Sequence, residues 1–192
     1  MRTVKIEFKQ EFYAIVEQSY VKSLTNRVFE FNFFENRPLH DKLGAQLAKG
    51  YLNEGDVGSF MVRIVKPGDI VVDVGANIGF YSMLLSALVT PVGAVHAFEP
   101  AEENVAEIIG NIAKNHFGNI VVHQKLMGEN IHELANFYYD QNDSGNSYAV
   151  SGDIDEALDC RRLPTHTLDS ELVDIKQIKL VKIDVEGFRL PC

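Results

Sequence analysis

From residue 67 onward, the pattern of hydrophobic and polar positions predicts alternating strands and helices. A β-branched apolar run at 70–74 predicts a buried strand. Apolar residues then recur on one helical face from Ile78 to Leu88, which predicts a helix. Further elements follow the same patterns: strands at 94–99, 120–123 and 178–185, and a helix that begins near Glu102. Short connections between such elements predict an α/β fold: a mostly parallel, Rossmann-like sheet with helices on both faces.

The chain is predicted to consist of an N-terminal flank and one main domain. Residues 1–50 are predicted to form an N-terminal cap or flank, because the alternation at their start favours a short strand and the aromatic stretch at 10–34 fits helix or strand. Residues 51–192 are predicted to form the Rossmann-like domain. Within it, a polar turn at 140–147 between two apolar stretches predicts an inserted β-hairpin.

Polar residues at two helix starts are predicted to cap those helices. Asn77 precedes the first apolar helical pattern, and Asp169 lies at the start of a helical pattern at 167–172. Asparagine and aspartate are favoured at this position because their oxygens accept hydrogen bonds from the free N–H groups of the first turn.

The chain stops five residues after Gly187, and Pro191 blocks continuation as a helix. We therefore expect the C-terminal strands of the fold to be missing, with the apolar strand at 178–185 at an exposed sheet edge. Such an edge favours self-association.

Composition narrows the function classes. The 27 acidic residues outnumber 18 Lys and Arg, and the formal net charge of −9 disfavours binding to nucleic acid. Cys160 and Cys192 form no metal-binding pair, no apolar leader is present, and no run approaches the roughly 20 apolar residues of a membrane span. These features predict a cytoplasmic protein without a membrane span.

A glycine loop follows the first buried strand in the pattern acid-x-G-x-x-x-G, with Asp73, Gly75 and Gly79. A dinucleotide fingerprint would need glycine where Asn77 and Phe80 stand. The missing second glycine matters because it lets the backbone approach a pyrophosphate. The loop therefore favours a nucleoside ligand without phosphates.

Two acidic residues at predicted strand ends support such a ligand. Glu99 lies 24 residues beyond Gly75, at the end of the second strand, where a carboxylate is placed to accept hydrogen bonds from ribose hydroxyls. Asp73 lies at the end of the first strand, and its negative charge suits an ammonium or a sulfonium-bearing amino-acid tail.

Together these residues resemble the FkbM-type family of S-adenosylmethionine-dependent methyltransferases. The resemblance spans roughly residues 50–188 and is carried by these blocks in order: Lys-Pro-Gly-Asp at 66–69, Asp-Val-Gly-Ala-Asn-Ile-Gly at 73–79, Ala-Phe-Glu-Pro at 97–100, Thr-Leu-Asp at 167–169 and Lys-Ile-Asp-Val-Glu-Gly at 182–187. It implies S-adenosyl-L-methionine as cofactor and a hydroxyl of a small molecule or sugar as acceptor.

The resemblance also implies roles for individual residues. The methionine end of the cofactor would be lined by Asp73, Gly75, Ala76, Asn77 and Gly79. Glu99 would hold the ribose hydroxyls, while Leu126 and Met127 would lie near the adenine.

The candidate catalytic residues are Asp184 and Glu186, at the end of a strand beside the first one. A hydroxyl acceptor must lose its proton, and a carboxylate can take it. We expect only one of the two to reach the acceptor unless the chain turns at Gly187, and we expect Asp184 to lie nearer the reacting centre. Alternatively, Asp184 caps the strand end and Glu186 binds loop amides. No spacing of histidines and carboxylates predicts a metal site.

The sequence thus predicts an S-adenosylmethionine-dependent methyltransferase that acts on a hydroxyl group. Two alternatives remain open: a truncated or catalytically inactive module that binds the cofactor, and an NAD-type oxidoreductase.

Overall fold

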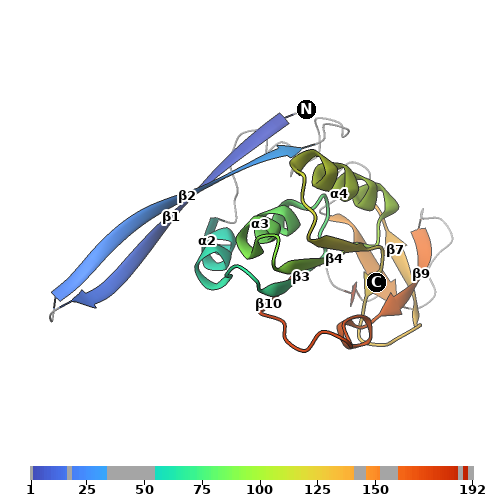
Figure 1. Cartoon of the computed structure of the whole chain (residues 1–192). Helices are drawn as coiled ribbons and strands as arrows, with labels where there is room; N and C mark the ends of the chain where they lie inside the picture. Colours follow the sequence, from blue (N-terminus) through green and yellow to red (C-terminus); the bar gives the residue numbers. More distant parts are fainter. Residues whose placement is uncertain are drawn as a thin grey trace.

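A computed structural model describes the backbone of residues 2–16, 19–33, 55–140, 146–151, 160–185 and 188–189, and the side chains at 57–140, 146–150 and 160–185. Its centre is a parallel four-stranded sheet (Figure 1). The strands are β3 (Ile70–Val74), β4 (Ala94–Phe98), β5 (Ile120–His123) and β10 (Leu180–Ile183), in the spatial order β10-β3-β4-β5. This arrangement confirms the predicted α/β fold.

The helices and strands alternate along the chain as the periodicity predicts. The helices are α2 (Gly55–Ile64), α3 (Phe80–Val89), α4 (Glu102–Asn115) and the short α5 (Leu168–Glu171). Val71 and Val95 pack against α2 and α3 on one face of the sheet. Val72 and Phe98 pack on the opposite face in a cluster with Leu172, just after α5. Both faces are covered, which explains why these strands are mostly apolar.

Most of a second sheet is inserted between β5 and β10, and its last strand, β11 (Phe188–Arg189), follows β10. Its strands are β6 (Leu126–Met127), β7 (Leu134–Tyr138), β8 (Tyr148–Ser151), β9 (Cys160–His166) and β11, in the order β11-β8-β7-β9-β6. The antiparallel pair β7–β8 is the predicted hairpin. Leu126, Ala135, Phe137 and Ala149 form the apolar centre of this sheet, together with Ala101 at the start of α4.

The N-terminal segment forms an antiparallel pair, β1 (Arg2–Val16) and β2 (Ser19–Phe33), that extends away from the central sheet (Figure 1). The base of this pair lies against the helices, with β1 next to α2 and β2 next to α4. The strand expected at the start of the chain is therefore present and longer than the alternation indicated.

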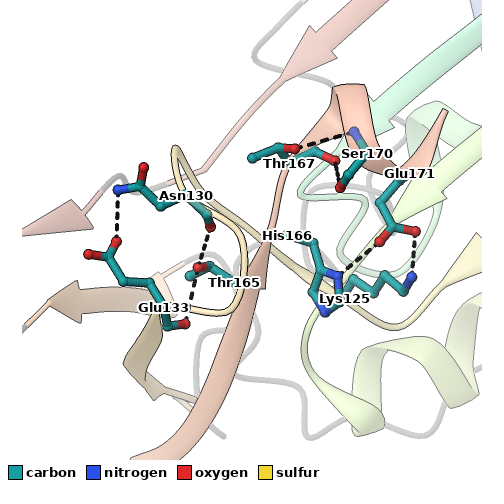
Figure 2. A network of polar contacts seen from close by, with 8 residues as sticks. All are labelled: Lys125, Asn130, Glu133, Thr165, His166, Thr167, Ser170 and Glu171. Atoms are coloured by element: carbon teal, nitrogen blue, oxygen red, sulfur yellow. Dashed lines mark hydrogen bonds and ion pairs between the residues drawn. The ribbon is translucent and has the colours of Figure 1, made fainter. Parts of the chain in front are cut away.

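Both predicted helix caps are wrong by two residues. Helix α3 begins at Phe80 with Gly79 at the N-cap, while Asn77 lies in the turn before it with φ of 51°. Helix α5 is capped by Thr167, whose side-chain oxygen accepts a hydrogen bond from the Ser170 amide at 3.3 Å (Figure 2). Tertiary contacts of the glycine loop, described below, set the start of α3.

Strand β10 is the outer strand of the central sheet within the described residues. Val181 and Ile183 of this strand are 40% and 64% exposed, and Val185 just after it is 54% exposed. These residues form an apolar surface at the predicted edge, and self-association through it stays a prediction. Among the helices of the described ranges, none combines the length and apolar character that crossing a membrane requires.

Candidate functional site

The glycine loop at 75–79 lies where the order of the central sheet reverses. Along the chain, the strands that follow β3 add on one side as β4 and β5, and the last one, β10, adds on the other side. Ligands of open α/β sheets bind beyond the carboxyl ends of the strands at such a switch point. The loop, the end of β4 and the end of β10 are thus the parts of the chain that would form a site (Figure 1).

The backbone amides of the loop donate hydrogen bonds to acceptors within the chain. The pairs are Gly75 and Ala76 to the Phe98 carbonyl oxygen (3.0 and 3.1 Å), Asn77 to Glu99 Oε2 (2.9 Å) and Gly79 to the Ala76 carbonyl oxygen (2.8 Å). A phosphate-binding loop needs such amides to point at the anion. Because these amides are engaged by the protein, the loop is built as a rigid turn and not as an anion cradle.

Helix α4 fastens the far side of the loop. The Asn111 side-chain amide donates to the carbonyl oxygen of Ile78 at 2.9 Å. Gly79 lies so close to Ile108 that a Cβ atom there would be 3.3 Å from the Ile108 side chain. These two contacts hold the residues that precede α3, which explains why this helix starts after Gly79.

Glu99, predicted to bind a ribose, is only 4% exposed, and its carboxylate accepts hydrogen bonds from three groups of the chain. Its Oε2 accepts from Asn77, while Oε1 accepts from the Ala101 amide and from the Asn104 side chain, both at 3.0 Å. Burial raises the pKa of Glu99 to about 7, against the effect of these hydrogen bonds. Its carboxylate therefore links the glycine loop to the start of α4, and a ribose contact remains a prediction.

Asp73 is fully buried at the end of β3. Its Oδ2 accepts a hydrogen bond from the Ser82 hydroxyl at 2.7 Å, and the Lys182 ammonium lies 3.0 Å from Oδ1. Lys182 was not singled out from the sequence. The available signal is a lysine inside an apolar strand pattern, between Val181 and Ile183.

The end of β10 is packed directly against the loop. A Cβ atom at Gly75 would lie 2.0 Å from the carbonyl oxygen of Asp184 and 3.0 Å from the Val185 side chain. The Asp184 amide donates to the Val74 carbonyl oxygen at 3.0 Å, and its side chain is 61% exposed. The structure therefore brings Asp184 beside the glycine loop, whereas Glu186 lies outside the described residues.

The predicted adenine contacts divide between two environments. Leu126 is buried in the centre of the second sheet. Met127 packs against the cluster that contains Val72 and Val74 of β3 and Phe98 of β4. Met127 thus lies against residues of the central sheet, whereas the Leu126 side chain packs within the second sheet.

A polar cluster of Lys125, His166 and Glu171 joins the two sheets (Figure 2). Lys125 follows β5, His166 ends β9 and Glu171 ends α5. The Glu171 carboxylate forms an ion pair with Lys125, and its other oxygen lies 2.9 Å from His166 Nδ1. The hydrogen bond from Lys125 is the main cause that lowers the pKa of Glu171. The sequence pattern did not indicate this cluster, since its members lie up to 46 residues apart.

His96 and His123 lie side by side on β4 and β5, with His96 Nδ1 3.0 Å from His123 Nε2. The His123 ring also stacks on Phe98 with 4.3 Å between ring centroids. Burial lowers the pKa of both histidines. Their position is that of packed residues within the sheet, as their place in the strand patterns predicted.

The fold and the loop at its switch point define an α/β protein of Rossmann-like type. Residues 73–192, more than half of the chain, match the family described as "Methyltransferase FkbM domain". The chain therefore belongs to the FkbM methyltransferase family, as its sequence blocks indicated.

Individual relatives overlap with parts of the chain. The 31-O-demethyl-FK506 methyltransferase FkbM of Streptomyces tacrolimicus is 47% identical over 51 residues, which are 27% of this chain and 19% of that protein. An rRNA methylase from Streptococcus thermophilus overlaps with 35% of this chain and 36% of its own, at 19% identity and a TM-score of 0.33. An S-adenosylmethionine-dependent O-methyltransferase from Thermotoga maritima overlaps with 64% of this chain and 44% of its own, at 19% identity and a TM-score of 0.38. The chain spans less than half the length of each of these relatives.

Proposed function

We propose that this chain binds S-adenosylmethionine and forms part of a methyltransferase that acts on a hydroxyl group of a small molecule or a sugar. One observation carries the proposal: the glycine loop after β3 meets Asp184, just after β10, and Glu99, just after β4, at the switch point of the sheet. Membership of the FkbM methyltransferase family supports it. The curated relative, by its name, methylates 31-O-demethyl-FK506, which supports a small-molecule acceptor.

The residues at the loop suit this cofactor better than a dinucleotide. A pyrophosphate needs loop amides as donors, and the amides of Gly75, Ala76 and Asn77 already donate within the chain. An ammonium and a sulfonium instead need negative charge, and the exposed carboxylate of Asp184 supplies it beside the loop. The cofactor, when bound, supplies an activated methyl group on sulfur.

Under this proposal, the chain's own residues position the reactants and accept a proton. The loop backbone holds the methionine end, while Met127 contributes an apolar surface on the side of β6. Asp184 carries the exposed carboxylate beside the loop, and we assign it the removal of the acceptor hydroxyl proton, a step worth about 10²–10⁴-fold in rate. Glu186 remains a second candidate for this role.

Calorimetric titration with S-adenosylhomocysteine tests the cofactor assignment, and titration with NADH is its matched control. We expect saturable binding of S-adenosylhomocysteine and none of NADH. Circular dichroism of the same sample verifies that it is folded. A folded sample that binds NADH, or that leaves millimolar S-adenosylhomocysteine unbound, contradicts the proposal.

Transfer of a labelled methyl group to a panel of sugars and hydroxylated small molecules tests the activity. We expect transfer by the parent chain and its loss in Asp184→Asn. Cofactor binding without transfer to any member of the panel would favour the alternative of a non-catalytic, cofactor-binding module.

A further inference from the structure

Lys182 lies where β10, β3 and the glycine loop meet. Its ammonium is 3.0 Å from Asp73 Oδ1 and 3.4 Å from Asp184 Oδ2, and it donates a hydrogen bond to the Gly75 carbonyl oxygen at 3.3 Å. The side chain is 10% exposed. A lysine that buries its charge this far needs compensating partners, and here they come from both sides of the switch point.

Strand register produces this arrangement. Lys182 of β10 pairs with Asp73 of β3 in a parallel ladder, so the two side chains stand next to each other on the same face of the sheet. The neighbours of Lys182 along the strand point the other way and are exposed. The Tyr81 ring completes the surroundings, with its centroid 5.0 Å from the ammonium, within the range of a cation–π interaction.

The ammonium is oriented toward the loop as well as toward its counterion. The ammonium forms an ion pair with Asp73, 3.0 Å from Oδ1. It also donates a hydrogen bond to the Gly75 carbonyl oxygen. Neutralising Asp73 would not by itself require this direction, so the geometry indicates a second role toward the loop.

Energetics alone would not favour such a pair. Removing two charges from water costs as much as their attraction returns, and well-packed apolar residues often stabilise a fold equally well. The pair of Lys182 and Asp73 lies at the edge of the sheet where ligands bind. Its presence there is explained if it holds in place the groups that face the ligand. Gly75 and Asp184 are the two groups that Lys182 touches there.

We propose that Lys182 is a positioning residue of the cofactor site, whose ammonium neutralises Asp73 and holds the Gly75 carbonyl group and the Asp184 carboxylate in one arrangement. The inference rests on the proposed function, because it assumes that the loop and Asp184 face S-adenosylmethionine. Lys182 acts through these two groups and does not contact the cofactor itself.

Three variants separate this role from that of a simple counterion. Lys182→Met removes the charge, Asp73→Asn combined with Lys182→Met removes both charges, and Lys179→Met is the control because Lys179 is an exposed lysine just before the same strand. Affinity for S-adenosylhomocysteine is measured by calorimetry, and stability by urea unfolding. The single variant should lose stability and affinity, because Asp73 is left buried without a counterion.

The double variant decides the question. We expect it to regain most of the stability, while its dissociation constant stays at least about tenfold above that of the parent, the loss that corresponds to one hydrogen bond with a charged donor. Parent-like affinity in the double variant would show that Lys182 is only a counterion. Lys179→Met should match the parent in both measurements.

Lys182→Arg covers the case in which the double variant does not fold. It keeps the positive charge beside Asp73, but its planar guanidinium does not reproduce the donor directions of the ammonium toward Gly75 and Asp184. We expect near-parent stability with a severalfold weaker affinity, and an unchanged affinity would overturn the inference. If the folded parent itself does not bind S-adenosylhomocysteine, the proposed function fails first. A parent that binds while all Lys182 variants bind equally well refutes only the role of Lys182.

Discussion

Two glycines with positive φ show how differently the same residue type is used in this chain. Gly75 has φ of 73°, and a Cβ atom there would lie 2.0 Å from the Asp184 carbonyl oxygen. Gly68 has φ of 88°, but nothing lies within 4 Å of a Cβ atom there. Gly75 is thus required by the packing of β10 against the loop. A large residue there would disrupt the loop itself before it could compete with a ligand.

We therefore expect Gly75→Ala to destabilise the chain far more than Gly68→Ala. Backbone strain accounts for about 1–3 kcal/mol at either site, and the clash at Gly75 adds about as much again. Urea unfolding of the two variants measures the difference. Equal losses would mean that the end of β10 does not press on the loop.

We expect Glu99 to couple cofactor binding to pH. Its pKa is raised to about 7 by burial, and its ionised carboxylate accepts the Asn77 amide of the loop. Protonation of the Glu99 carboxylate removes a hydrogen-bond acceptor from the donors of Asn77, Ala101 and Asn104. If only the ionised form binds, affinity for S-adenosylhomocysteine should fall about tenfold between pH 8 and pH 6.

The matched variant is Glu99→Gln, which has similar size and does not titrate. It should bind more weakly than the parent at pH 8, because its amide nitrogen cannot accept a hydrogen bond, and its affinity should not change over this pH range. A parent chain whose affinity stays constant down to pH 6 would exclude Glu99 from control of the loop.

The Glu99 carboxyl group should make the chain less stable as pH rises, although affinity for S-adenosylhomocysteine is expected to increase. Because its pKa rises from an ordinary 4.5 to about 7 on folding, the folded chain binds more protons than the unfolded chain between these values. The contribution of Glu99 to stability is therefore full below pH 4.5 and falls by roughly 3 kcal/mol as pH rises to 7. Urea unfolding of parent and Glu99→Gln across this range measures it, and parallel stability curves would contradict it.

At the scale of single elements, the N-terminus of α5 depends on Thr167. The hydroxyl oxygen of Thr167 accepts from the Ser170 amide, and the Ser170 hydroxyl donates to the Thr167 carbonyl oxygen at 2.8 Å (Figure 2). Thr167→Ala should cost about 0.5–2 kcal/mol of stability, the usual effect of losing an N-cap. Asp169→Ala, a change two residues away inside the helix, should cost less. Thermal unfolding of both variants checks the order, and a larger loss for Asp169→Ala would reinstate it as the cap.

The glycine loop also shows why element boundaries depended on more than local preference. Asparagine is a good N-cap, yet the Asn77 amide is directed to Glu99 of the neighbouring strand, and the Ile78 carbonyl oxygen is directed to Asn111 of α4. These contacts shape the turn and delay the helix to Phe80. The periodicity that predicted the element was correct, but the start was decided by residues 22 and 33 positions away.

At the scale of the whole molecule, polar contacts connect the inserted sheet to the central one. Arg161 of β9 forms a two-pronged ion pair with Glu103 of α4, but both side chains are about two-fifths exposed. Exposed pairs of this kind contribute about 0–1 kcal/mol. The more buried cluster of Lys125, His166 and Glu171 is therefore the more important connection (Figure 2).

The acid sensitivity of this connection can be predicted. The pKa of Glu171 is lowered on folding, first by the hydrogen bond from Lys125, so its contribution to stability is present above its ordinary value of 4.5 and is lost as pH falls through the lowered folded value. Glu171→Gln should destabilise the chain near neutral pH and make no difference in strong acid. Urea unfolding at both conditions checks this, and a loss that is independent of pH would contradict it.

The sequence by itself determined what depends on local pattern. Alternation with period 2 or 3.6 reports which face of each element is buried, so the order of strands and helices, the parallel sheet and the glycine loop between β3 and α3 could be predicted. The family blocks indicated the same domain. These features hold because each element must hide its own apolar face, whatever its distant neighbours are.

Tertiary structure alone decided which side chains meet. Lys182 and Gly75 are 107 residues apart, and their contact depends on the register of β10 against β3. Likewise, Glu99 accepts a hydrogen bond from the Asn77 amide of the loop and Asp184 packs against Gly75 because three strand ends converge at one edge. A shift of one residue in register would turn these side chains to the other face, and no local pattern encodes that choice.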